Sequence, residues 1–151
     1  MNDLRKFLIP WSEQMSSQEA LYRAKGLVKT IATEFWEEPS AADLHETFCR
    51  THKGTNLSVG AKALCKHFAR KGPIMETHPF WLAPRGSEVQ KSEDARRQLD
   101  DMLRRTVWRN IHRLNKHVVV YEIRNELGYG MRWNMTPRLE FRGFLEAHQL
   151  S

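Results

Sequence analysis

The apolar residues of this chain change their spacing near residue 117. Before that point they recur every three or four residues, which is the spacing of one helix face. From Val118 onward they alternate with polar residues, as in a strand with one buried face. A helical half followed by a run of strands indicates an α+β fold, in which helices cover one face of an antiparallel sheet. Because 151 residues can bury a sizeable core, we expect residues 1–151 to form a single compact domain.

Three helices are predicted in the N-terminal half of the chain. The first begins at a capping box, Ser16 with Glu19, and ends before Pro39. The second covers residues 40–54 and the third about 58–70. The second and third helices together predict a helix-turn-helix-like unit, because they are joined by a short connection that contains a glycine.

The second half is predicted to hold one long helix and a β-meander. Residues 73–91 carry three prolines and no clear period, so we expect an ordered connection. A fourth helix is expected over about 92–116, packed on a three-stranded antiparallel sheet. Its buried stripe would consist of Leu99, Leu103, Val107, Ile111 and Leu114. The strands are expected at 118–124, 131–135 and 139–145, with a core face of Val119, Tyr121, Ile123, Met131, Trp133, Met135, Leu139, Phe141 and Leu145.

The net charge of +6 comes from one stretch of the chain that contains no acid. Between Thr47 and Met75 there are six Lys and Arg and no Asp or Glu. Like charges gathered in one segment attract a polyanion, because their fields add. The chain is therefore predicted to bind a nucleic acid.

The third predicted helix supplies a basic face for this binding. Lys62, Lys66 and Arg70 recur at i, i+4 and i+8, opposite an apolar face. In a helix-turn-helix reader the second helix enters the DNA major groove, so we predict a DNA-binding protein of this kind. The predicted nucleic-acid-binding residues are Arg50, Lys53, Lys62, Lys66, Arg70 and Lys71.

Three alternatives stay open at this point. The lysines can belong to an ordinary solvated helix face. The chain can be an adaptor or structural subunit that docks its basic strip on an acidic partner protein. It can also be an enzyme that acts on a phosphate-bearing substrate, with a histidine supplying acid–base chemistry.

The outer face of the meander mixes acids with bases. It would carry Glu122, Arg124, Arg132, Asn134, Glu140 and Arg142. Its arginines can contact phosphates, with Tyr129 and Phe144 as stacking platforms for bases. Because the signs alternate, cross-strand ion pairing is the favoured interpretation.

No motif of a known catalytic or metal site is present, and an enzyme is not the favoured interpretation. His45, Cys49, His52, Cys65 and His67 lie close in sequence but lack ligand spacing, so no metal and no cofactor is predicted. The chain has no P-loop, H-E-x-x-H or G-x-S-x-G. If an active site exists, the histidines to test first are His67, His78, His112 and His117.

The two cysteines and the hydropathy bear on location. Cys49 and Cys65 are expected to be reduced, buried thiols, which favours an intracellular protein, nuclear or cytoplasmic, with an organelle left open. No apolar run is long enough for a transmembrane helix, and the first residues do not resemble a secretory signal. No membrane partner is expected.

Overall fold

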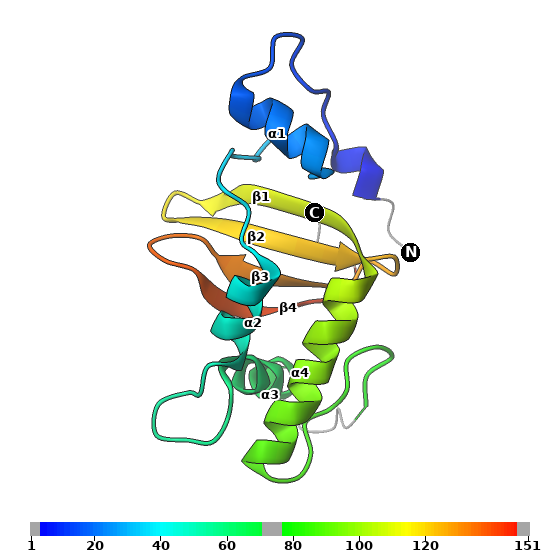
Figure 1. Cartoon of the computed structure of the whole chain (residues 1–151). Helices are drawn as coiled ribbons and strands as arrows, with labels where there is room; N and C mark the ends of the chain where they lie inside the picture. Colours follow the sequence, from blue (N-terminus) through cyan, green and yellow to red (C-terminus); the bar gives the residue numbers. More distant parts are fainter. Residues whose placement is uncertain (1–3, 71–76, 148–151) are drawn as a thin grey trace.

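The computed structural model describes residues 4–70 and 77–147. Within them the chain forms four α-helices and a four-stranded antiparallel sheet (Figure 1), so the predicted α+β class is confirmed. The helices are α1 (Ser17–Lys25), α2 (Ala41–Cys49), α3 (Val59–Arg70) and α4 (Glu88–Arg105). The strands are β1 (Thr106–Asn115), β2 (Val118–Asn125), β3 (Gly130–Asn134) and β4 (Glu140–Leu145).

The sheet is a meander in which each strand pairs with the next along the chain. Helices α2 and α4 lie across one face of it, and α3 lies beyond β4 (Figure 1). Helix α1 lies at the opposite end, past β1 (Figure 1). The segment after α1 pairs with the outer edge of β1, where the Val28 N–H donates to the Arg109 carbonyl at 2.9 Å. No described helix is long and apolar enough to cross a bilayer.

The first helix is shorter than predicted. Its predicted cap at Ser16 is confirmed, since the Ser16 hydroxyl accepts from the Glu19 N–H at 3.1 Å. The reciprocal half of the predicted capping box is wrong, because the Glu19 carboxylate accepts from the Ser12 N–H and from Lys29, both at 2.8 Å. The helix ends at Gly26, which adopts the left-handed conformation with φ of 83°. The extension to Pro39 is wrong, because the chain beyond Gly26 instead runs along β1, with the Arg113 N–H donating to the Ala32 carbonyl.

The next two helices form where the sequence predicts them. Ser40 and Asp43 make a reciprocal capping box at the start of α2. Helix α2 ends at Cys49, earlier than the predicted Gly54. Helix α3 follows the predicted 58–70 range and buries Ala61, Leu64 and Phe68, whereas Cys65 is only half-buried. The predicted stop at residues 72–73 lies outside the described residues.

The fourth predicted helix is wrong in its second half, which forms strand β1. Helix α4 begins after Ser87, whose hydroxyl accepts from the Gln90 N–H, and therefore takes in residues 88–91 of the predicted connection. It ends where the Thr106 hydroxyl donates to the Met102 carbonyl at 2.6 Å. The β-branched and aromatic residues at 106–108 favour an extended backbone. The sheet therefore has four strands and not three.

A bulge in β4 changes which side chains face the core. Trp133 lies opposite Phe141 and Arg132 lies opposite Gly143, so Arg142 is an extra residue in β4. Phe144 consequently packs in the hydrophobic core. The alternation of apolar and polar residues along the strand had predicted that Phe144 faces outward. Leu145, predicted on the core face, lies opposite Gly130 and outside the main core cluster, although its side chain is still buried. The remaining predicted core-face residues of the meander belong to the core or pack against it.

Candidate functional site

A cavity of about 270 Å³ lies between α3 and β4. It has apolar walls that include Val59, Phe141 and Phe144. No Asp or Glu is among its described lining residues. The lining side chains that are positively charged or can be protonated are His52, Lys62, Lys66, His67, Arg70 and Arg142. Such a cavity attracts anions, because every ionisable group in its wall has the same sign when charged.

The cavity brings together three of the six predicted binding residues. Lys62, Lys66 and Arg70 lie one helical turn apart along α3 and all three line the cavity. No described carboxylate lies within 4.0 Å of their charged nitrogens. The cations of α3 are therefore available to a bound anion.

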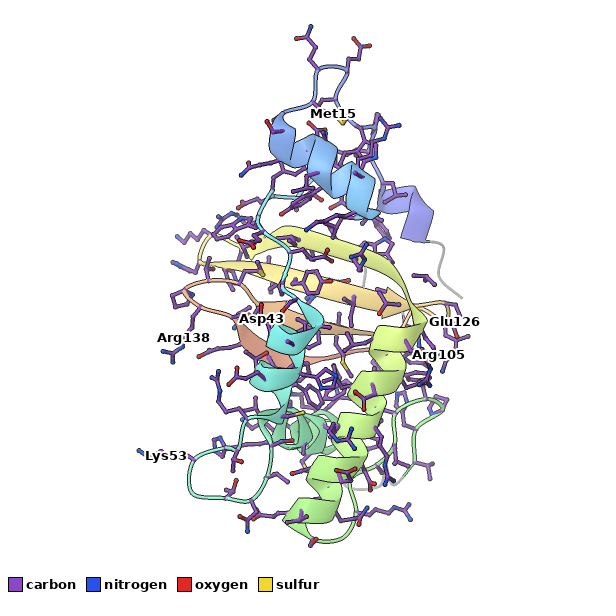
Figure 2. The ribbon with its side chains drawn as sticks, in the orientation of Figure 1. Met15, Asp43, Lys53, Arg105, Glu126 and Arg138 are labelled. Carbon is purple, nitrogen blue, oxygen red and sulfur yellow. The ribbon has the colours of Figure 1, made fainter. Side chains whose placement is uncertain are left out.

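The other three predicted residues do not join them. Arg50 donates to both carboxylate oxygens of Glu46, at 3.0 and 2.8 Å, one turn earlier in the chain. Lys53 is exposed on the loop between α2 and α3 and points away from the body of the molecule (Figure 2). Lys71 lies outside the described residues.

His52 is held beside Lys62 in this cavity. The Nζ atom of Lys62 lies 2.6 Å from the Nε2 atom of His52. An ammonium group can only donate, so Nε2 of His52 accepts this hydrogen bond and carries no proton. The backbone fixes the position of His52, because its N–H donates to the Leu57 carbonyl at 2.7 Å across the turn before α3.

His67 is held by the carboxylate of Glu146. Nε2 of His67 lies 3.0 Å from Oε2 of Glu146, and Nε2 of His78 lies 2.7 Å from Oε1. Nδ1 of His78 accepts from the backbone N–H groups of Phe80 and Trp81, both at 2.9 Å. His78 is therefore neutral, with its proton on Nε2, and it donates to Glu146.

The ionised state of Glu146 follows from these contacts. Burial by itself raises the pKa of Glu146, but the hydrogen bonds from His78 and His67 outweigh it and lower the pKa below its ordinary value. A charged carboxylate thus fixes the orientation of the His67 ring at the cavity wall. Sequence reasoning selected His67 and His78 but missed Glu146, since no pattern joins positions so far apart in the chain.

A second cavity, of about 320 Å³, adjoins the first around β4. Arg70, Arg142, Gly143 and Phe144 line both cavities. The second cavity adds Arg132, from the outer face of the sheet, and Leu145.

The outer face of the sheet contains a buried ionic cluster around Glu122. Its carboxylate, which is fully buried, accepts from Arg124 at 2.8 Å, Arg132 at 2.7 Å and His112 at 2.9 Å. Burial raises the pKa of Glu122, but the His112 hydrogen bond and the two arginine charges outweigh it and lower the pKa to about 2. The predicted ion pairing of Glu122 with arginines is confirmed, whereas Glu140 pairs with Arg138 and not across the strands.

The remaining candidates do not form a site of their own. The Tyr129 ring is stacked on Phe80, with centroids 4.5 Å apart, and is not an open platform for a base. His117 is exposed in the turn between β1 and β2. Within residues 4–70 and 77–147, no three His, Cys, Asp or Glu side chains gather in a way that could hold a metal ion.

Residues 48–146 match the sequence profile of a family described as the CdiA C-terminal tRNase toxin domain. The matched segment is well over half of the chain and contains the lining residues of both cavities, which run from His52 to Leu145. No curated protein and no solved structure matches the chain. The predicted helix-turn-helix DNA-binding function is wrong, because the matching family is one of tRNase toxin domains and the basic face of α3 lines a cavity against β4. The chain belongs to the CdiA C-terminal tRNase toxin domain family.

Proposed function

We propose that this chain is a ribonuclease that cleaves tRNA, and that the cavity between α3 and β4 is its active site. One observation carries the proposal: in a chain of a tRNase family, two histidines and four cations line one cavity without a described carboxylate among them. A phosphodiester is an anion that needs both positive charge and acid–base groups for its cleavage. Of the alternatives left open by the sequence, we carry forward the enzyme that acts on a phosphate-bearing substrate.

His52 and His67 have the chemistry that cleavage of RNA needs. A general base removes the proton from the 2′-hydroxyl, whose oxygen attacks the neighbouring phosphorus. The bond from phosphorus to the 5′-oxygen breaks, and a general acid protonates that oxygen. His52 acts as the base: its Nε2 atom carries no proton, and its lone pair becomes free for the 2′-hydroxyl when Lys62 shifts from it to the phosphate. His67, oriented by Glu146, acts as the acid. The products are a 2′,3′-cyclic phosphate and a 5′-hydroxyl.

The cations of α3 stabilise the charge that develops on the phosphate. Two negative charges accumulate on the phosphoryl oxygens in the pentacoordinate transition state. Lys66 and Arg70 lie on the same wall of the cavity as His67 and can donate to these oxygens. Because the described lining holds no carboxylate, their charge is not neutralised before the substrate binds.

Purified chain incubated with total tRNA tests the proposal. We expect discrete tRNA fragments with 5′-hydroxyl ends, which a polynucleotide kinase labels without prior phosphatase treatment. DNA of the same sequence as the cleaved tRNA lacks the 2′-hydroxyl and stays intact. The double variant His52→Ala, His67→Ala should lose cleavage, and His117→Ala, a histidine of the exposed turn, is the matched control. Intact tRNA with the wild-type chain, or cleavage by the double variant at the wild-type rate, contradicts the proposal.

A further inference from the structure

The second cavity has the composition of a phosphate site. Three guanidinium groups line it, from Arg70, Arg132 and Arg142. As in the first cavity, no carboxylate is among the lining residues that the structure describes. Arginine presents its donors in a planar fork that matches two oxygens of a phosphate. Three guanidinium groups that line a cavity of about 320 Å³ repel one another, and a bound anion would reduce this repulsion.

The buried cluster on the outer face of the sheet fixes one of these arginines. Nε of Arg132 donates to Oε1 of Glu122 at 2.7 Å. Glu122 is in turn held by His112 and Arg124, so its carboxylate cannot turn away. No described acceptor lies within hydrogen-bond range of the two terminal nitrogens of Arg132, which therefore have donors for a ligand. A buried ion pair contributes little to the net free energy of folding. The role of this pair is to hold Arg132 at the rim of the cavity.

Gly143 connects the two cavities. It lines both of them, and it lies on β4, the last strand in the order of the sheet. A β-carbon placed on Gly143 would have no atom within 4 Å, so open space lies above the strand at this position. The missing side chain leaves room for a ligand to cross β4 between the two cavities.

We propose that the RNA strand crosses β4 at Gly143, and that the cavity of Arg70, Arg132 and Arg142 binds the phosphate next to the one that is cleaved. The inference rests on the proposed function for the identity of the ligand, a single strand of RNA. It adds a second phosphate site that is separate from the histidines. The substrate is then a segment of at least two successive phosphates with its bases unpaired, because the strand must bend around an edge of the sheet.

Binding of an RNA that cannot be cleaved tests this site apart from catalysis. The probe is a fluorescent 10-nucleotide RNA with 2′-O-methyl groups throughout, which lacks the attacking hydroxyl. Each phosphate contact adds about 0.7 to the slope of log K against log salt for a single strand. We expect the double variant Arg132→Gln, Arg142→Gln to lower this slope by about 0.7, because the second cavity holds one phosphate, and to weaken binding at least tenfold. A slope equal to that of the wild type overturns the proposal.

Two further variants complete the experiment. Arg97→Gln, Arg104→Gln is the matched control, because both side chains lie on α4 and are largely exposed, at 68% and 72%; we expect an unchanged slope. In Gly143→Leu the new side chain begins in open space, so the variant should fold, which circular dichroism can verify. It should weaken binding of the probe at least tenfold, because the leucine would block the path of the strand. If Gly143→Leu binds as tightly as the wild type, the strand does not cross β4 there. Cleavage of tRNA by the wild-type chain is scored separately, so the active site and the second phosphate site can fail independently.

Discussion

Lys62 directs its ammonium group at the ring of His52, with 2.6 Å between Nζ and Nε2. The two residues come from different elements, His52 from the turn and Lys62 from the first turns of α3. Since the lysine can only donate, Nε2 of His52 carries no proton, and its lone pair accepts from Lys62 until that ammonium moves to a phosphate of the substrate. It also places a positive charge beside the nitrogen that removes a proton in the proposed reaction.

His52 and Lys62 are predicted to act as one unit in catalysis. We expect His52→Ala to lower kcat/KM for tRNA by about 10²- to 10⁴-fold, the usual contribution of a general base. Lys62→Met should lower it less, because the ring remains. The double variant should lose little more than His52→Ala alone, since residues that act together are not additive. Steady-state cleavage of a purified tRNA measures all three; strict additivity contradicts the coupling.

The sequence predicted the fold class and the basic face of α3 but not the site. The serine caps at Ser16 and Ser40 and the stripe of α3 are local signals, and local signals place element starts well. The end of α4 was missed because Val107, Ile111 and Leu114 fit a helical stripe, while the pairing of β1 with β2 decides the outcome.

The site depends on contacts that no local pattern encodes. His67 and Glu146 lie 79 residues apart in the chain and meet only because α3 packs beside β4. The bulge at Arg142 likewise depends on pairing with β3, and it alone places Phe144 in the core. The acid-free stretch did identify the helix whose cations line the cavity. Its predicted meaning, DNA binding by a helix-turn-helix unit, was wrong because the chain matches a family of tRNase toxin domains, and no charge pattern separates a groove-binding helix from one that lines a cavity against β4.

The α3 cations are predicted to set the salt dependence of tRNA binding. Measured in a His67→Ala background so that tRNA stays intact, Lys62→Ala, Lys66→Ala, Arg70→Ala should reduce the slope of log K against log salt by about 2 to 3. Fluorescence polarisation at several salt concentrations gives the slope. The matched triple variant replaces exposed arginines outside both cavities, Arg97, Arg104 and Arg138. If both triple variants lower the slope equally, the cavity is not the binding site.

Gly60 is predicted to be needed for the packing of α3 on α2. A β-carbon at Gly60 would lie 2.3 Å from ring carbons of Phe48, whose side chain is fully buried. Gly60→Ala should therefore destabilise the fold by about 1–3 kcal/mol, the cost of overpacking a core. Gly143→Ala is the same chemical change in open space and should be nearly neutral. Urea unfolding compares the two variants, and equal midpoints would show that Phe48 moves aside without cost.

The buried Glu122 is predicted to make stability fall in acid. Its folded pKa of about 2 lies below the unfolded value of about 4.3. The ionised carboxylate therefore stabilises the fold above the unfolded value, and this contribution is lost as the pH falls toward 2. At pH 7, Glu122→Gln should cost about 3–5 kcal/mol, because it leaves arginines buried without their partner.

The pH profile of this cost separates an ionic effect from a packing effect. The difference in unfolding free energy between the wild type and Glu122→Gln should shrink between pH 4.5 and pH 2, because protonation of the wild-type carboxyl removes the same charge. Glu126→Gln is the control, since Glu126 lies at the surface beside Arg105 (Figure 2) and its loss exposes no buried charge. Denaturant unfolding at four pH values gives the curve. A difference that stays constant down to pH 2 would mean that Glu122 acts through shape and not through its charge, and that Arg132 is held at the second cavity by packing alone.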